Sequence, residues 1–370
     1  MIENIKFFNL TYNKKDINFF LKKSKDVLDR GFISESFYTK LFEEKISKKF
    51  KFLNSIFVGS GTDALEIAFK LTDPKKKIIL QANNFFAAHV ALEQSNKKAL
   101  YCDLELASLG IDPDSLESIL KKNKDIDSIC LVHTGGIISD NIEDICYLAK
   151  KYNCVLIEDA AHAHGSKKNG IYAGNFGDIS CFSFFPTKVM TTGEGGLINL
   201  KRKKDFYKAR SLKNFGRNLK DEWIREINGS NCKVTEFQSI LGLLELKRFN
   251  QRIYKRKVLF DRYKKNLSNS NFKIYDSNQD QNSFYKIILE HKNFSYNQLI
   301  KLFKKKKIPT SGRVWPYPLN NQKFKPKIKY LKKNLINTEY FVKNHFCLPL
   351  YPELTIKEVD TICMELLHVK

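Results

Sequence analysis

Apolar and polar positions along residues 50–200 alternate between short apolar or β-branched runs and longer segments of helical period. This alternation is typical of βαβ units, which form a mostly parallel sheet with helices packed on it. The region is therefore predicted to be α/β. The expected strands are 55–58, 78–81, 99–103, 128–133, 155–158, 180–184 and 196–199, and the expected helices are 63–71, 113–121 and 142–152.

The flanking segments have different patterns. Two amphipathic helices are expected at 15–30 and 37–50, and one long helix with a recurrent apolar face at 234–265. The last hundred residues predict a strand at 284–289, a helix at 296–305, a Pro-rich loop at 315–318 and a final helix at 356–367. We therefore predict two domains: residues 1–250, with the N-terminal helices and a large α/β domain, and residues 251–370, a small C-terminal α+β domain.

Hydropathy and cysteine content indicate the cellular compartment in which the protein is expected. The longest apolar runs are far shorter than the roughly 20 residues that span a membrane, and the N-terminal residues lack the apolar core of a signal peptide. The eight cysteines are scattered, without a C-x-x-C pair or a metal-ligand spacing. We expect a cytoplasmic protein with reduced cysteines, no bound metal and no membrane partner.

The net charge is +24, from 64 basic and 40 acidic residues. Such a surplus favours anionic partners, which include nucleic acids, acidic lipids and phosphorylated small molecules. The chain has no arginine-rich arm, helix-turn-helix signature or zinc-finger spacing. A solvated lysine-rich surface is therefore favoured over a nucleic-acid partner.

A glycine-rich segment, GSGTDA at residues 59–64, lies between a predicted strand and a predicted helix. The amides and dipole of a helix N-terminus bind anions, and small residues let a phosphate approach. The segment also matches the dinucleotide fingerprint, which requires an acidic residue about 20 positions further on. The next strand instead ends in QANN, residues 81–84. We predict a phosphate site rather than a dinucleotide site, with a plain tight turn as the alternative.

An apolar strand ends in two acids, followed by two histidines, in LIEDAAHAHG at residues 156–165. Ligands bind at such strand ends in open α/β sheets. A carboxylate there can hold a proton on a heterocyclic nitrogen, and an imidazole can bind or stack on the same ring. A metal site of Asp159, His162 and His164 is an alternative, although their spacing matches no known ligand motif. Surface or N-cap roles are a further alternative for each residue.

One lysine, Lys188, follows an aromatic strand and precedes a glycine-rich turn in SCFSFFPTKVMTTGEGG, residues 180–196. Most lysines of this chain are expected to be solvated surface charges. Lys188 differs because its neighbours are apolar, and desolvation would lower its pKa and make the amine nucleophilic. Such a lysine is suited to forming a Schiff base.

Together, the three motifs indicate one kind of site much more specifically than any single motif does. A phosphate cradle at a helix N-terminus, a carboxylate at a strand end and a reactive lysine are the groups that a pyridoxal phosphate enzyme needs. The sequence therefore predicts this cofactor.

The motifs resemble those of the DegT/StrS-type nucleotide-sugar aminotransferases, a fold type I pyridoxal phosphate family. The resemblance rests on SGTxAL at 60–65, EDAAH at 158–162 and SFxxxKxxTTGEGG at 183–196, and more weakly on Gly31, on FE at 42–43 and on LPLYP at 348–352. It implies a mostly parallel seven-stranded sheet with helices on both faces plus a smaller C-terminal α+β domain. It also implies pyridoxal 5'-phosphate as cofactor and a homodimer with active sites at the interface.

The resemblance also implies roles for individual residues. Lys188 would hold the cofactor as an aldimine and move a proton between the substrate carbon and the cofactor. Asp159 would keep the pyridine nitrogen protonated, and His162 would lie beside the ring near its phenolic oxygen.

Other implied residues surround the cofactor. Phe85 would stack on the ring, with Phe86 as the alternative, and Asn231 would reach the phosphate held by the neighbouring subunit. The remaining implied phosphate ligands are Gly61, Thr62, the amide of Asp63, and Ser183.

Three positions depart from the family pattern. Lys233 stands where many members have arginine, Asn320 where histidine is common, and VHTGG at 132–136 replaces the usual His-Leu-x-Gly form. The first two changes fall on the expected sugar or nucleotide side. His133 could contact substrate or be a satisfied structural histidine.

By the resemblance, the reaction is transamination of a nucleotide-diphosphate keto-sugar with glutamate as amino donor. A dehydratase branch of the same family is one alternative, but it has histidine in place of the lysine, so Lys188 argues against it. A Rossmann oxidoreductase is weakened by the missing acid after the second strand. Lys188, Asp159 and Ser183 together disfavour a regulatory or nucleic-acid-binding protein that keeps the fold without catalysis.

Overall fold

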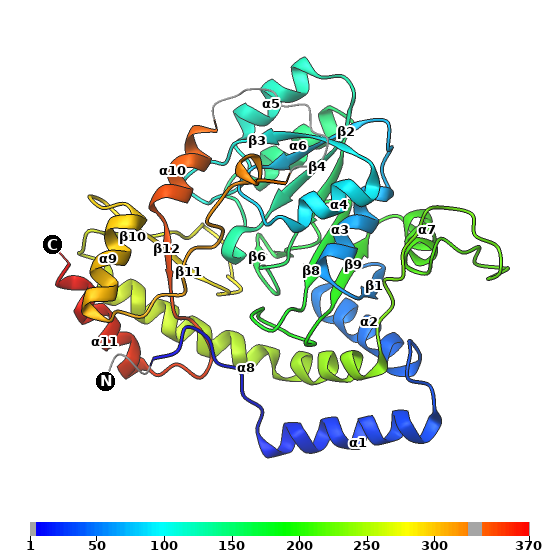
Figure 1. Cartoon of the computed structure of the whole chain (residues 1–370), viewed down its shortest axis with the longest axis horizontal. Helices are drawn as coiled ribbons and strands as arrows, with labels where there is room; N and C mark the ends of the chain where they lie inside the picture. Colours follow the sequence, from blue (N-terminus) through cyan, green and yellow to red (C-terminus); the bar gives the residue numbers. More distant parts are fainter. Residues whose placement is uncertain (1–4, 325–334, 370) are drawn as a thin grey trace.

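The computed structural model describes residues 5–324 and 335–369. At its centre is a seven-stranded sheet in the order β1-β9-β8-β5-β4-β2-β3 (Figure 1). Strand β9 pairs antiparallel with β1 and β8, and the other pairings are parallel. The strands are β1 (Ser55–Val58), β2 (Lys77–Gln81), β3 (Lys98–Cys102), β4 (Ile126–Val132), β5 (Val155–Asp159), β8 (Ile179–Ser183) and β9 (Gly196–Leu200). Every strand predicted for this sheet is confirmed.

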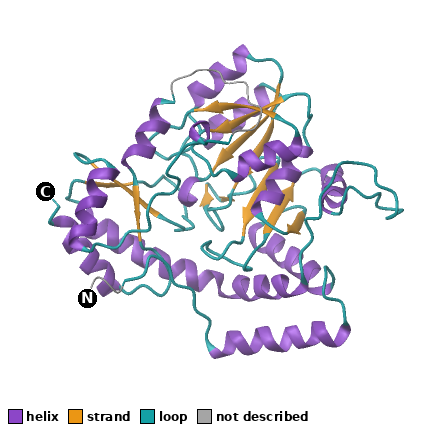
Figure 2. Cartoon of the chain, viewed as in Figure 1, coloured by secondary structure: helices purple, strands orange, loops and turns teal. Residues whose placement is uncertain are grey.

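Helices cover both faces of the sheet (Figure 2). Apolar side chains of α3 (Gly61–Lys70), α4 (Ala87–Ser95) and α7 (Lys203–Lys213) share one core with the sheet. Those of α2 (Phe37–Phe50), α5 (Pro113–Lys122) and α6 (Ile142–Lys151) share another. Helices α4 and α7 were not predicted, because the buried residues of α4 are mostly small or polar and α7 is rich in lysine, so neither has a distinct apolar stripe.

The long helix α8 (Glu236–Leu267) confirms the helix predicted at 234–265 and runs beneath both parts of the molecule (Figure 1). Helix α1 (Lys14–Arg30) packs against it. The predicted domain boundary between residues 250 and 251 falls inside α8, which continues through it unbroken. The two parts therefore share one helix, and the boundary stays a prediction.

The C-terminal part is α+β. Strands β10 (Phe272–Ile274), β11 (Ile287–His291) and β12 (Phe346–Leu348) form an antiparallel sheet beside α9 (Tyr296–Lys306), α10 (Ile336–Asn344) and α11 (Ile356–Leu367). The strand predicted at 284–289 begins later, at Ile287, because Phe284 has a left-handed φ of 52° that interrupts an extended run. This turn places Tyr285 and Lys286 at the wall of a cavity between the two parts of the molecule.

The other described elements are short: β6 (Lys167–Lys168), β7 (Ile171–Tyr172), η2 (Thr134–Gly136) and η3 (Leu319–Asn321). Within residues 5–324 and 335–369, no helix combines the length and apolarity needed to span a bilayer.

A carboxylate from α8 holds the start of α2. The N-cap residue Ser36 makes no capping bond with its own side chain. The buried Glu236 instead accepts hydrogen bonds from the amides of Ser36 (2.9 Å), Tyr38 (2.7 Å) and Thr39 (2.9 Å), and from the Thr39 hydroxyl (2.7 Å). This one side chain therefore fixes α2, and with it one helical layer of the sheet, to α8.

Glu236→Ala should destabilise the protein strongly, because it leaves several amides at the start of a helix without an acceptor. We expect the free energy of unfolding, measured by urea denaturation with circular dichroism, to fall by about 3 kcal/mol or more. The control Glu339→Ala, at an exposed position on α10, should change it by less than about 0.5 kcal/mol. Equal stability of the two variants would contradict this role.

Candidate active site

A cavity of about 340 Å³ lies at the carboxyl ends of β4, β5 and β8, next to the N-terminus of α3. Residues from the C-terminal part complete its wall, so the two parts of the molecule enclose it together. The cavity is lined by most of the residues predicted to bind a cofactor or to act in catalysis: Gly61, Thr62, Phe85, Asp159, His162, Ser183 and Lys188. The other two predicted residues, Asp63 and Asn231, are not among its lining.

The N-terminus of α3 forms a cradle at one side of this cavity. Ser60 is the N-cap, and its Oγ accepts the Asp63 amide at 3.0 Å. The amides of Gly61 and Thr62 make no hydrogen bond within the described ranges, so they remain available to an anion. Ser183, at the end of β8, lies so near that a Cβ on Gly61 would be 2.8 Å from its own Cβ. Asp63 is thus placed at the cradle, but its amide is already bonded to Ser60.

Asp159 ends β5 as a buried carboxylate. Its oxygen accepts the Ala161 amide at 3.2 Å, and it has no ion pair with any described residue. Burial raises the pKa of this carboxyl, opposed by the Ala161 amide and by the positive charge of Lys188. A cation bound in the cavity would compensate for that burial, and a protonated heterocyclic nitrogen is such a cation.

Lys188 is half-buried and presents its amine to the cavity. Its Nζ lies 4.9 Å from the ring centroid of Tyr285, while the neighbouring Val189 and Met190 are buried and anchor the segment. The apolar surroundings predicted for Lys188 are therefore found around its neighbours Val189 and Met190, and not around its amine. The amine itself faces an aromatic ring.

His162 lies between two aromatic rings from the C-terminal part. Its ring stacks on Tyr285 with centroids 4.3 Å apart and on Trp315 at 5.2 Å. The Gly135 amide donates to Nδ1 at 3.2 Å. Burial holds the pKa of His162 well below its usual value, so the ring is neutral and carries its proton on Nε2. His162 is therefore a hydrogen-bond donor at the cavity.

The lining also includes Thr187, Tyr285, Lys286 and Trp315, which were not predicted as site residues from the sequence. The Tyr285 hydroxyl lies 3.3 Å from that of Thr187. Burial would raise the pKa of Tyr285, but the ammonium groups of Lys188 and Lys286 and the Thr187 hydroxyl together lower it. No local motif marks Tyr285 or Lys286, because only the packing of β11 against the large domain brings them to the cavity.

Several other residues singled out in the sequence also lie outside the cavity, among them Phe86, His133, His164 and Asn231. Phe86 borders a neighbouring groove, and its ring lies 4.0 Å from that of the cavity-lining Phe85. His133 is buried and bonds through Nε2 to Glu158 at 2.8 Å, as expected of a structural histidine. His164 is buried beside Phe182 and Phe184, and burial lowers its pKa to about 3. Asn231 is exposed and pairs with Asn214 at the base of a loop.

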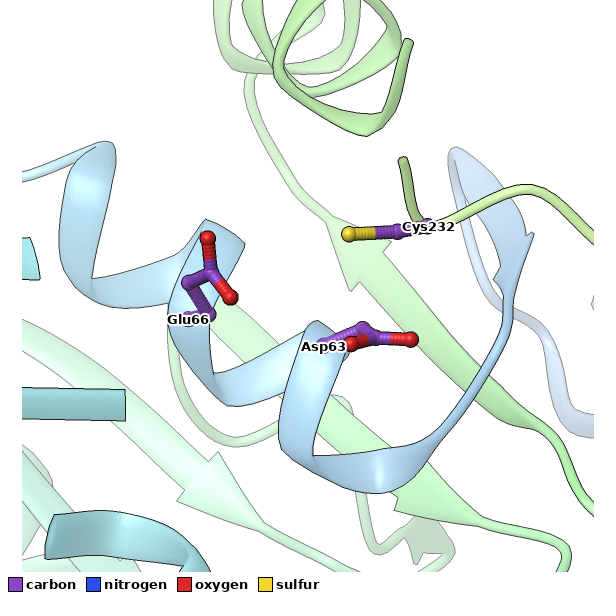
Figure 3. A group of neighbouring side chains, drawn as sticks. All are labelled: Asp63, Glu66 and Cys232. Atoms are coloured by element: carbon purple, nitrogen blue, oxygen red, sulfur yellow. The ribbon is translucent and has the colours of Figure 1, made fainter. Parts of the chain in front are cut away.

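Behind the cradle, the side chains of Asp63, Glu66 and Cys232 converge (Figure 3). Glu66 is already held by Lys70 (2.6 Å) and by the Ser230 hydroxyl (2.6 Å). Burial raises the pKa of the Cys232 thiol to about 12, which disfavours the thiolate that metals bind. These contacts describe a cluster that links α3 to the segment before α8.

Known proteins are similar to this chain in sequence and in fold. A Campylobacter jejuni UDP-4-amino-4,6-dideoxy-N-acetyl-beta-L-altrosamine transaminase is 30% identical over 330 residues, covering 87% of this chain and 86% of the relative. A GDP-perosamine synthase from Escherichia coli is 30% identical over 259 residues, covering 69% and 70%.

Two solved structures show the same fold. A DegT DnrJ EryC1 StrS aminotransferase from Brucella abortus superposes with a TM-score of 0.90 at 20% identity, over 99% of this chain and 100% of that one. A Streptococcus pneumoniae protein solved in its PLP form has a TM-score of 0.85 at 24% identity, over 98% of each chain.

The cavity lies at the carboxyl edge of a mostly parallel sheet, which is where α/β enzymes bind their ligands. Residues 14–367 match the DegT/DnrJ/EryC1/StrS aminotransferase family. The chain belongs to this family, which implies pyridoxal phosphate as its cofactor. The observed cavity fits that group, because it offers free amides for a phosphate, a buried carboxylate for a ring nitrogen and a lysine amine.

Gly196→Ala should damage the cradle, since its Cβ would lie 2.1 Å from the carbonyl oxygen of Ser60. We expect the dissociation constant for pyridoxal phosphate, measured by absorbance titration, to rise at least about tenfold, equivalent to about 1.4 kcal/mol. Gly170→Asn is the control, because that position has a left-handed φ of 76° and open space. Unchanged affinity in Gly196→Ala would contradict the placement of the phosphate.

Proposed function

We propose that this protein is a pyridoxal phosphate-dependent aminotransferase that converts the keto group of a nucleotide-diphosphate-linked sugar to an amine, with glutamate as amino donor. One observation carries the proposal: Lys188, Asp159 and the free amides at the start of α3 line a single cavity. When bound there, pyridoxal phosphate supplies an electron sink for negative charge at the substrate carbon.

The chain's own residues divide the remaining tasks. Gly61, Thr62 and Ser183 bind the phosphate, with the amide of Asp63 nearby. Asp159 holds the proton on the ring nitrogen, because a carboxylate in so dry a site strongly favours a cationic partner.

Lys188 holds the cofactor and then moves a proton at the substrate carbon. Its amine can leave and return without unfolding the segment, because the buried neighbours of Lys188 fix the backbone. His162 donates its Nε2 proton to the ring oxygen, and Phe85 covers a face of the ring.

The substrate class rests on the relatives and on charge. The names of both reported relatives contain a nucleotide-linked amino sugar, one with UDP and one with GDP. The net charge of +24 supports an anionic substrate of this kind. Glutamate is proposed as the amino donor because the sequence resembles the DegT/StrS-type aminotransferases.

A dehydratase is the second candidate, because a GDP-4-keto-6-deoxymannose-3-dehydratase shares the fold, with a TM-score of 0.86 at 19% identity. Likeness at this identity supports the fold alone. Lys188 favours transamination, since a lysine amine can both hold the cofactor and return the proton.

We also propose a homodimer. The loop between α7 and α8 projects away from the body of the protein (Figure 1) and exposes Leu219, Trp223 and Ile224, with Trp223 89% exposed. Exposed apolar clusters of this kind mark interaction sites. Asn231 lies at the base of the loop, where it would reach the phosphate in the partner's cavity.

The nucleotide-linked substrate and the eight free cysteines support a cytoplasmic location.

Lys188→Ala should abolish covalent attachment of the cofactor and amino transfer. Borohydride reduction of the loaded protein, followed by peptide mass spectrometry, should place the cofactor on Lys188 in the wild type and on no peptide of the variant. Lys201→Ala, an exposed lysine, is the control and should label normally. Normal labelling of Lys188→Ala would show that another lysine holds the cofactor.

Trp223→Asp should weaken the dimer, because it places a charge in the apolar cluster of the loop. In sedimentation velocity, we expect the dimer dissociation constant to rise about tenfold or more, equivalent to about 1.4 kcal/mol. Tyr147→Asp, at a 62% exposed site on α6, should sediment like the wild type. A fully active wild-type monomer would refute the dimer.

A further inference from the structure

Lys286 is a second ammonium group in the cavity. It directly precedes β11 and lines the cavity together with Lys188. Its Nζ lies 5.5 Å from the ring centroid of Tyr285, whose ring is also 4.9 Å from the Nζ of Lys188. Two cations therefore approach the same buried tyrosine.

Lys286 has no anionic partner in the described part of the chain. It makes no salt bridge or hydrogen bond through its ammonium there, and the acids that line the cavity are Asp159 and Glu194. Under the proposed function, Asp159 faces the ring nitrogen and Lys188 is engaged by the cofactor. Glu194 is exposed on the turn before β9. Lys286 is then the ammonium left without a partner.

The positive charge of Lys286 affects the pKa values of two other groups that line the cavity. Together with Lys188 it lowers the pKa of Tyr285 against the effect of burial, and it adds to the burial that lowers the pKa of His162. Such a half-buried ammonium makes stronger contacts with an anion than a surface lysine does, because water screens it less.

We propose that Lys286 is the anion-binding residue of the substrate site, where its ammonium binds an oxyanion of the reacting molecule. The oxyanion is either the carboxylate of the amino donor or the diphosphate of the nucleotide sugar. This inference rests on the proposed function and adds to it a residue that selects substrates by charge.

The test compares three variants in the cofactor-loaded protein. Lys286→Met removes the charge and keeps most of the side-chain volume, and Lys286→Arg keeps the charge. Lys292→Met removes one exposed positive charge just after the same strand and is the matched control. Two quantities are measured: the glutamate concentration that half-converts the cofactor spectrum, and the dissociation constants of UDP and GDP by calorimetry.

We expect Lys286→Met to raise at least one of these values about tenfold or more, equivalent to about 1.4 kcal/mol, while Lys286→Arg and Lys292→Met stay near the wild type. A change confined to glutamate assigns the carboxylate, and a change confined to the nucleotides assigns the diphosphate. A change in both means that both oxyanions use this ammonium.

The inference is overturned if Lys286→Met leaves all values unchanged, or if Lys286→Arg or Lys292→Met is equally impaired. Failure of the proposed function looks different, because the wild-type spectrum itself would then not respond to glutamate. If the wild type also bound neither nucleotide, both proposals would fall.

Discussion

The proposed site depends on one buried carboxylate, which forms no ion pair with any residue in the described ranges of the chain. Asp159 ends the central strand β5, and burial opposes its ionised form. Proteins retain such a group where a bound partner compensates for the lost hydration. Under the proposed function, a protonated pyridine nitrogen would meet that need, and the same carboxylate would in turn keep the nitrogen protonated. One interaction would then support both the binding of the cofactor and the electronic state of its ring.

Topology brings the other groups to this carboxylate. Because β4, β5 and β8 run parallel, their carboxyl ends meet at one edge, and the turn from β1 to α3 directs a helix N-terminus to the same edge. The C-terminal part adds Tyr285 and Trp315, which hold His162 in a stack. The site is therefore complete only while α8 holds both parts together.

Local patterns were sufficient for most elements and for the groups with local chemistry. The strands of the central sheet have distinct apolar runs, and Lys188, Asp159 and Gly61 stand in motifs with a physical role, so sequence could place them in one site. Their individual roles remain predictions. The positions of Tyr285 and Lys286 in the cavity wall could not be predicted from the sequence, because a turn at Phe284 and packing between distant segments place them there. Helices α4 and α7 were missed for a similar reason, since their packing partners, rather than their own periodicity, stabilise them.

The most direct test is the visible absorption spectrum of the protein loaded with pyridoxal phosphate, recorded before and after the addition of glutamate. We expect a yellow band that gives way to the spectrum of the amino form of the cofactor, because the site provides both the lysine and the ring-nitrogen partner. A protein that stays colourless with added pyridoxal phosphate would contradict the cofactor site. A yellow protein that does not respond to glutamate would contradict the donor.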